Sequence, residues 1–296
     1  MLKHTADFLS AHRIITHPGQ AHRDDLLAVA FALAVNPKLS VFRRDPQPVE
    51  LADQSTIVID VGLKHDPAFL NFDHHQFPRD FEPMSALTLV LEHLGVLDAA
   101  RMTFGWVEFT EVLDSKGPVQ AAKWLGTSMD KFHATISPVE VFVLSAFQDV
   151  PASGLHPGDP LHAMLVSLGT NKLRYVERFA ERFQKLCKFA VIKHLDLEGG
   201  KKLEVVDVSF ITKAEDPLLA LEAWIKTYFP TAAATISLDD RGDGTTVFRR
   251  NDHPRLDFSV LEGKEGTVFA HKSGFVAKLA YGVDPLVAIR QSIKPE

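Results

Sequence analysis

The chain has little cysteine and no long hydrophobic run. Its single cysteine, Cys187, excludes an internal disulfide and a zinc site built from several thiolates. The longest apolar runs, such as residues 26–35, have about half of the roughly 20 residues that a membrane-spanning helix needs. The first residues are mixed in charge and lack the apolar core of a secretory signal. We therefore expect a cytoplasmic protein without membrane spans, in which any bound metal has oxygen and imidazole ligands.

The chain also lacks the excess of basic residues that is typical of duplex-binding proteins. Its formal net charge is −6, which argues against a broad basic surface. Carboxylates gathered around divalent cations raise the negative count, however, and the bound ions reverse the local field. The charge therefore does not exclude a nuclease. The length of 296 residues exceeds what one compact core usually holds, so two domains are expected.

The first half of the sequence alternates strand and helix patterns, which is typical of a parallel sheet covered by helices. Strands are predicted over Arg13–Thr16, residues 40–44 and Thr56–Ile59, and a helix over Asp24–Val35. Further helices are predicted over residues 85–95, 99–114 and 137–149. These patterns predict an α/β fold.

The second half has a different pattern. After a segment rich in proline and glycine at residues 151–160, a long helix is predicted from Leu161 to about Leu195. Short strands then surround one helical segment beyond Gly199, which predicts a smaller α+β domain. We therefore expect a first domain over residues 1–160, a helical connector over 161–198 and a carboxyl-terminal domain over 199–296.

Histidines and aspartates gather in the loop that follows the first strand. In THPGQAHRDD, His17 ends the strand, and His22, Asp24 and Asp25 precede or begin the helix. Open α/β sheets bind ligands at the carboxyl ends of their strands, and imidazole with carboxylate suits manganese, iron or zinc. A helix-capping role for Asp24 and a surface location for the histidines would explain this segment equally well.

Two further segments add candidate ligands. The strand TIVI ends in Asp60, which could bridge two metals but could also serve only in a turn. Thirteen residues later, FDHHQ places Asp73, His74 and His75 in succession. Neighbouring side chains in an extended segment point to opposite sides. One histidine could therefore bind metal while the other reaches a phosphate or supports the ligands.

These segments, in order and spacing, resemble the motifs of the DHH-type phosphoesterases. Within that superfamily the chain resembles the melanocyte proliferating gene (MYG) family of DHH-like hydrolases and exonucleases. The resemblance rests on THPGQAHRDD, VIDVG, NFDHHQ and, as a fourth motif, EVLDSKG with Asp114. It implies a DHH-type parallel-sheet domain with flanking helices that carries the metals and the catalytic site, and a smaller substrate-binding domain that closes over it.

The resemblance also implies roles for individual residues. One metal would be bound by His17 with His22 or Asp25, a second by Asp24, His74 and Asp114, and Asp60 would bridge the two. His75 would face the scissile phosphate, so that Asp60 and His75 would be the catalytic residues. Many DHH enzymes have an aspartate where this chain has Ala21, with His22 following. Imidazole in place of carboxylate favours softer metals.

The carboxyl-terminal half offers candidate phosphate contacts. Arg249, Arg250 and Arg255 could grip phosphate with planar forks, and His271 with Lys272 precedes a flexible Ser-Gly pair. This part resembles the substrate-binding domain of the DHH superfamily. A solvated basic loop is the other interpretation.

The expected function is that of a metal-dependent phosphodiester hydrolase, exonuclease-like, acting on RNA or short single-stranded oligonucleotides. Two divalent ions, manganese first with magnesium, iron or zinc as alternatives, would share Asp60 and activate a water. A small-molecule phosphoesterase acting on nucleotides or pyrophosphate is an alternative, as is a metal-binding scaffold without catalysis. Six candidate ligands for two ions leave open coordination positions, which favours an enzyme.

Overall fold

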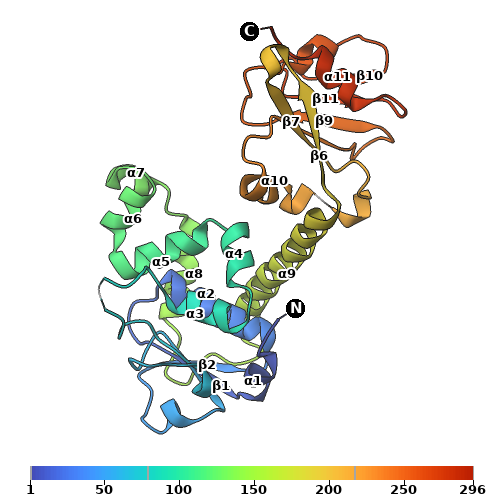
Figure 1. The fold of residues 1–296 in the computed structure, drawn as a ribbon. Helices are drawn as coiled ribbons and strands as arrows, with labels where there is room; N and C mark the ends of the chain where they lie inside the picture. Colours follow the sequence, from blue (N-terminus) through green and yellow to red (C-terminus); the bar gives the residue numbers. More distant parts are fainter. Residues whose placement is uncertain (1, 79, 217, 296) are drawn as a thin grey trace. The chain divides into compact units, whose positions relative to one another are not determined.

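The computed structural model describes residues 2–78, 80–216 and 218–295. The chain divides into two compact units, Met1–Glu177 (unit 1) and Arg178–Glu296 (unit 2), and the long helix α9 (Pro160–Phe189) contains the division (Figure 1). The prediction that this helix continues to Leu195 is wrong. Strand β6 (Val191–Asp196) follows it, because these residues pair along their whole length with β7 (Lys202–Asp207).

Unit 1 is built on a mainly parallel sheet with the order β2-β1-β3-β5-β4. The central strand β1 (Arg13–Thr16) pairs in parallel with β2 (Ser40–Arg43) and with β3 (Thr56–Ile59). Beyond β3 lie β5 (Asn71–Phe72), also parallel, and the antiparallel β4 (His65–Asp66). The first three strands lie where the sequence predicts them. β4 and β5 were not predicted, because two residues are too short to show an alternating pattern.

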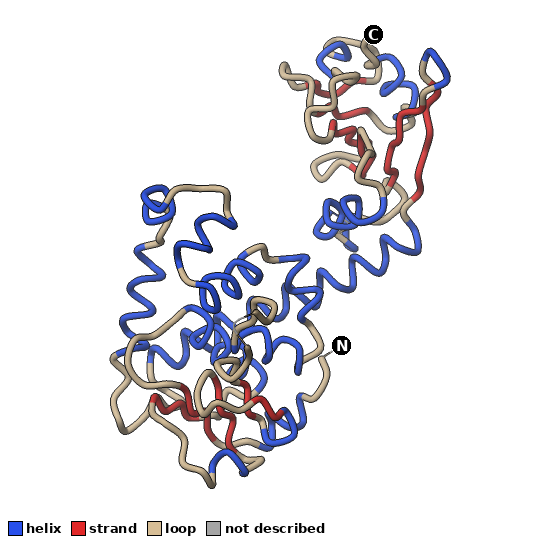
Figure 2. Tube along the Cα trace, turned by 60° about the vertical axis from the view of Figure 1, so that its left-hand side comes forward, coloured by secondary structure: helices blue, strands red, loops and turns tan. Residues whose placement is uncertain are grey.

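Helices pack around this sheet (Figures 1 and 2). Helix α2 (Arg23–Val35) follows β1 as predicted. The helix expected over residues 99–114 is instead two helices, separated at Phe104-Gly105. The remaining elements of unit 1 are α1 (Thr5–Ser10), α3 (Ala86–His93), α4 (Leu97–Thr103), α5 (Trp106–Lys116), α6 (Pro118–Trp124), α7 (Met129–Ala134), α8 (Pro138–Gln148) and the short 3-10 turns Glu50–Ala52 and Pro67–Phe69.

The core of unit 1 is a single hydrophobic cluster around α2. Val29, Phe31 and Leu33 of this helix are buried together with Ile14 of β1 and Ile57 of β3. Burial of each large apolar side chain stabilises the fold by about 1.5–3 kcal/mol. The first turn of α2 is also buried, and it carries Asp24 and Asp25. Two carboxylates therefore stand at the edge of this core, where an unpaired charge is costly.

Unit 2 is a mixed sheet with the order β10-β11-β9-β8-β7-β6. Val205 and Val206, adjacent on β7, belong to two different hydrophobic clusters, so both faces of this sheet are covered. This arrangement confirms the α/β fold with a smaller α+β part. The other elements are α10 (Leu218–Tyr228), β8 (Ala234–Leu238), β9 (Thr245–Arg249), β10 (Thr267–Ala270), β11 (Val276–Leu279), α11 (Pro285–Gln291) and 3-10 turns at Glu198–Gly200, Lys213–Glu215 and Phe258–Leu261.

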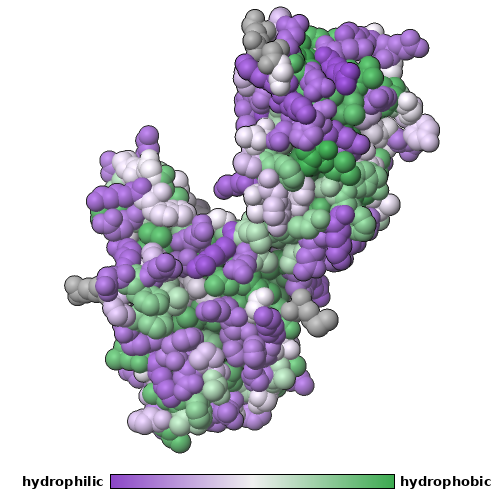
Figure 3. Space-filling model, viewed as in Figure 1, coloured by the Kyte–Doolittle hydropathy of each residue, from purple (hydrophilic) through white to green (hydrophobic). Residues whose placement is uncertain are grey.

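Hydrophilic and hydrophobic residues are mixed over the face of each unit that Figure 3 shows. Among the described residues, no helix combines the length and the apolar character needed to cross a membrane.

One glycine controls how closely α9 approaches α2. A Cβ atom added at Gly169 would lie 1.9 Å from the backbone oxygen of Ala30. Gly169→Ala should therefore lower the free energy of unfolding by about 1–3 kcal/mol, even though alanine favours helix by about 1 kcal/mol. Urea unfolding measures this change. Gly105→Ala is the control, because a Cβ there meets nothing within 4 Å, and equal stability of the two variants would contradict the packing argument.

Candidate metal centre

The candidate ligands of unit 1 come together at the carboxyl ends of its parallel strands. His17 directly follows β1, Asp60 follows β3, and Asp73 to His75 follow β5. The start of α2 brings Asp24 to the same place, and α5 brings Asp114. Asp60 has a left-handed backbone with φ of 59°, a conformation that aspartate tolerates better than most residues.

Asp60 lies between two imidazoles. Its Oδ2 is 3.4 Å from His17 Nε2, and its Oδ1 is 3.3 Å from His74 Nε2. His74 Nε2 is also 2.7 Å from Asp114 Oδ2. One carboxylate oxygen thus faces each side of the cluster, which is the arrangement that a bridging ligand requires.

The potential ligand atoms of these residues form groups in which all members lie within 4.8 Å of one another. Around Asp60, such sets join His17 with His22 and His74 with His75. A further set joins His22, Asp24 and Asp114. All of the predicted ligands, His17, His22, Asp24, Asp60, His74 and Asp114, therefore lie in one connected cluster.

The tautomer of His17 indicates that a cation belongs in this cluster. His17 Nδ1 is 2.7 Å from the carbonyl oxygen of Pro18, which can only accept, so Nδ1 carries a proton and donates it. In neutral imidazole, Nε2 then presents a lone pair. This lone pair faces carboxylate oxygens of Asp25 at 3.2 Å and of Asp60 at 3.4 Å. A proton or a metal ion on Nε2 relieves the repulsion.

Buried polar atoms without hydrogen bonds give the same indication. Both carboxylate oxygens of Asp24 and of Asp60 are buried without a well-formed hydrogen bond, and the same holds for Nε2 of His17 and of His74, even though the latter lies 2.7 Å from Asp114 Oδ2. Native proteins seldom leave such atoms unpaired. The donor set, imidazole with carboxylate, fits divalent ions such as manganese, iron or zinc.

The protonation equilibria of the cluster reflect its excess of negative charge. Burial, followed by repulsion from Asp60 and Asp114, raises the pKa of Asp24 well above its ordinary value. Burial likewise raises the pKa of Asp60. Burial lowers the pKa of His74, but the close carboxylates of Asp114 and Asp60 outweigh it and raise the pKa to about 10. Without a metal ion, His74 therefore carries a proton at neutral pH, and the protonated forms of Asp24 and Asp60 are favoured.

Asp25 has a different environment from the other carboxylates. Its Oδ2 is 2.7 Å from Nη1 of Arg43, and its Oδ1 accepts hydrogen bonds from the backbone N–H groups of His22 and Leu26. Arg43 in turn packs over the ring of Phe147 and donates to the carbonyl of Gly19. Asp25 is thus engaged by groups of the protein, whereas His22 is half exposed and its Nδ1 lies 3.9 Å from Asp114 Oδ1.

Asp73 orients His75. Its Oδ1 is 2.7 Å from His75 Nδ1, and its Oδ2 accepts a hydrogen bond from the backbone N–H of Leu63. The hydrogen bond with Asp73 raises the pKa of His75 against the opposing effect of burial. His75 is 53% exposed, whereas Asp73 is buried. The Asp73–His75 pair therefore presents, at the surface of the cluster, an imidazole whose charged form is favoured by Asp73.

Three cavities open onto the cluster. One of about 580 Å³ is lined by His17, His22, Asp60 and His75, and a smaller one of about 200 Å³ by His74, His75 and Asp114. The third, of about 530 Å³, runs from His22, Asp24 and Asp114 to an apolar wall that consists of Leu113, Phe132, Ile136, Val141 and Leu144. A ligand could thus reach the cluster from solvent.

The basic residues predicted to bind substrate lie in unit 2, and the structure does not bring them together. Arg250 is buried: its guanidinium pairs with Glu222 at 2.6 Å and donates to the carbonyl of Ala232. Its fork is therefore occupied by groups of the protein itself. Arg255 lines a cavity of about 660 Å³, whereas His271 and Lys272 line another of about 470 Å³. Their contact with substrate stays a prediction.

Comparison with known proteins supports the family suggested by the motifs. Residues 13–96 match the family model MYG1_exonuc, described as an uncharacterised protein family (UPF0160). The matched stretch contains the motifs from His17 to His75, and Asp114 and unit 2 lie outside it. The match supports the resemblance to the MYG family over these residues.

The other comparisons add less. No curated protein matches the chain. One similar solved structure is described as the DHH domain of a member of the s1p family of ribosomal proteins. The alignment covers 97% of this chain and 87% of that chain, with 14% sequence identity and a TM-score of 0.31.

Asp24→Asn tests the conflict between charge and burial at the cluster. The folded-state pKa of Asp24 is raised, so the stability that its protonated carboxyl contributes is fully present below the ordinary pKa of 3.8. This stability is lost as the pH rises from there through the folded-state pKa. Asparagine does not ionise, so the variant does not lose this stability as the pH rises. In the presence of a chelator, we expect the variant to have a higher free energy of unfolding than the parent at neutral pH, and we expect this difference to become smaller as the pH is lowered.

Urea unfolding at acid and neutral pH, with and without manganese, measures both effects. Manganese should raise the stability of the parent protein and have much less effect on the variant, because a ligand that binds only the folded state stabilises it. Equal stabilisation of both proteins by manganese would show that Asp24 is not a ligand.

Proposed function

We propose that this chain is a metal-dependent phosphodiester hydrolase that acts on RNA or short single-stranded oligonucleotides. The observation that carries the proposal is the position of Asp60, whose two buried oxygens each face a different imidazole and have no hydrogen-bond partner. The MYG family name points to hydrolase chemistry of the exonuclease type. The cluster provides ligands suited to that chemistry.

The family resemblance divides the candidate ligands into two sets that share Asp60. His17 and His22 would hold one divalent ion, manganese being the first candidate, and Asp24, His74 and Asp114 would hold the other. Bound divalent ions supply a water of lowered pKa and positive charge for the phosphate oxygens. The carbonyl of Pro18 would orient His17 through Nδ1, and Asp25, paired with Arg43, would not bind metal itself.

His75 would contact the phosphate. Asp73 fixes its Nδ1 and favours its charged form, which leaves Nε2–H as a donor toward the cavities that the ring lines. A charged hydrogen bond to a non-bridging phosphate oxygen becomes stronger as negative charge develops there.

The lining of the third cavity suits a substrate that carries a nucleobase better than it suits pyrophosphate. Its polar end holds His22, Asp24 and Asp114, and its wall holds the apolar side chains of Phe132 and Ile136. Pyrophosphate has no apolar surface to place there, whereas the face of a nucleobase stacks on apolar and aromatic side chains.

The openness of the cluster favours catalysis over a purely structural role. His22 and His75 are each about half exposed, and cavities reach the ligands. Structural metal sites are closed by protein ligands, whereas catalytic ones keep positions for water and substrate.

Asp60→Asn tests the hydrolase proposal. We expect the variant to fold and to lose manganese-dependent cleavage of a short RNA, because an amide cannot bridge two cations as a carboxylate does. The matched control is Asp66→Asn, since Asp66 pairs with Lys64 and lies outside the ligand sets. Cleavage is followed by gel electrophoresis, and folding by circular dichroism.

The substrate panel also contains short DNA, pyrophosphate and a generic phosphodiester. Cleavage of pyrophosphate alone would favour the small-molecule phosphoesterase, and inactivity on every substrate would favour the scaffold. Full activity of Asp60→Asn would refute the proposed role of Asp60.

Ile136→Ala tests whether the apolar wall of the third cavity contacts a nucleobase of the substrate. Ile136 is 45% exposed, so its truncation should be tolerated by the fold. We expect the KM for an oligonucleotide to rise by about threefold to tenfold with kcat unchanged, which corresponds to the apolar contact that is lost. Hydrolysis of the generic diester, which carries no base, should be unaffected. An unchanged KM for the oligonucleotide would place the base elsewhere.

A further inference from the structure

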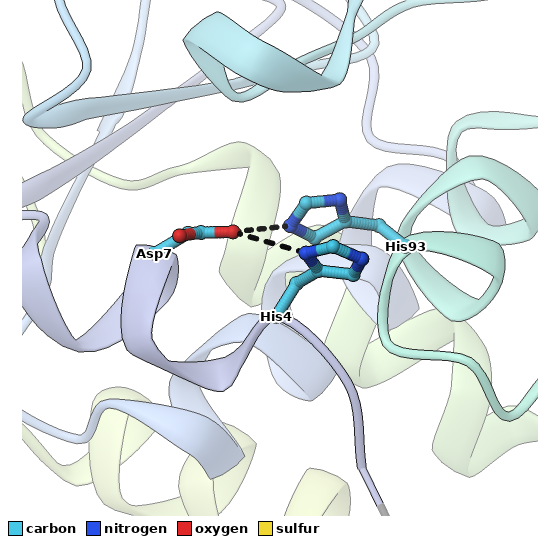
Figure 4. A group of neighbouring side chains, drawn as sticks. All are labelled: His4, Asp7 and His93. Atoms are coloured by element: carbon cyan, nitrogen blue, oxygen red, sulfur yellow. Dashed lines mark ion pairs between the residues drawn. The ribbon is translucent and has the colours of Figure 1, made fainter.

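A second group of metal-ligating side chains lies near the beginning of the chain and shares no residue with the central cluster. His4 precedes helix α1, Asp7 lies in its first turn, and His93 is the last residue of α3. Figure 4 shows one carboxylate oxygen of Asp7 facing a ring nitrogen of each histidine. The three ligand atoms lie within 4.8 Å of one another.

The separations in this group suit a metal ion better than hydrogen bonds. Asp7 Oδ2 is 3.4 Å from His4 Nδ1 and 3.6 Å from His93 Nε2. Both distances are longer than an ordinary charge-assisted hydrogen bond. Ligands about 2.0–2.1 Å from a tetrahedral zinc ion are separated from one another by about 3.3 Å. The observed distances are close to that value.

His93 points a buried and unpartnered nitrogen into the group. Its side chain is only 6% exposed, and its Nε2 has no hydrogen-bond partner. A neutral imidazole with an available nitrogen is the form that binds metal.

The surrounding residues hold the group in place. The ring of His93 stacks on Phe8 of α1 at 5.3 Å and on His4 at 4.8 Å, and Phe8 is fully buried. The backbone N–H of Lys3 donates to the carbonyl of Leu94. These contacts already fix the first residues of the chain against the end of α3, so the ligands need little rearrangement.

We propose that His4, Asp7 and His93 bind a divalent transition-metal ion of the zinc class. Two imidazoles and one carboxylate form a three-ligand site, and the exposure of His4 and Asp7 leaves the fourth position to water. The ion links α1 to the carboxyl-terminal end of α3, two segments that lie far apart in the sequence. Its effect is to stabilise unit 1, independently of the proposed hydrolase activity.

Zinc binding to the full-length chain tests this site. The probe is zinc chloride added to metal-free protein, measured by isothermal titration calorimetry. His4→Ala and Asp7→Asn are the test variants, because both positions are substantially exposed and the fold should tolerate the changes. His12→Ala is the matched control, since His12 is exposed, near in sequence and outside every ligand set.

We expect each test variant to bind about one equivalent of zinc less than the parent and the control. Zinc bound at the central cluster contributes equally to all four proteins and does not affect this difference. The zinc-dependent rise in melting temperature should be smaller in both test variants. Equal zinc stoichiometry in all four proteins would overturn the proposal and leave Asp7 as an ion-pair partner of the two histidines. Loss of hydrolase activity in Asp60→Asn has no bearing on this outcome.

Discussion

Compensation of negative charge is the constraint on which the first unit depends. Asp24, Asp25 and Asp60 are buried within a short distance of one another and of Asp114. Two unit charges at 4 Å repel by about 4 kcal/mol at the effective dielectric constant typical of proteins. Arg43 neutralises Asp25, and raised pKa values keep protons on other members. The buried start of α2 can therefore exist only with cations or protons among its carboxylates.

The sequence predicted the parts of the fold that have a strong local pattern. Strands Arg13–Thr16 and Thr56–Ile59 coincide with prediction, because each is an apolar, largely β-branched run next to turn residues. β4 and β5 are too short to leave a pattern. Strand β6 was assigned to the preceding helix, because its place depends on pairing with β7, which local sequence does not encode.

The candidate ligands were predictable from their positions after strands, whereas their partners were not. His17, Asp60 and His74 converge because parallel strands end at one edge of the sheet. Asp114 comes from a helix, and only the family resemblance indicated it. The clamp between Arg43 and Asp25 depends on β2 lying beside β1, and the inward orientation of Arg250 depends on Glu222 of α10. Such contacts between distant segments leave no mark in a single sequence.

The contact between Arg43 and Asp25 does not depend on metal. A guanidinium is charged at every physiological pH, so one carboxylate of the loop is neutralised as soon as β2 pairs with β1, whether or not metal is present. The protein can fold with protons on the remaining carboxylates and imidazoles. Folding thus need not wait for metal, and each ion that enters later releases protons into solution.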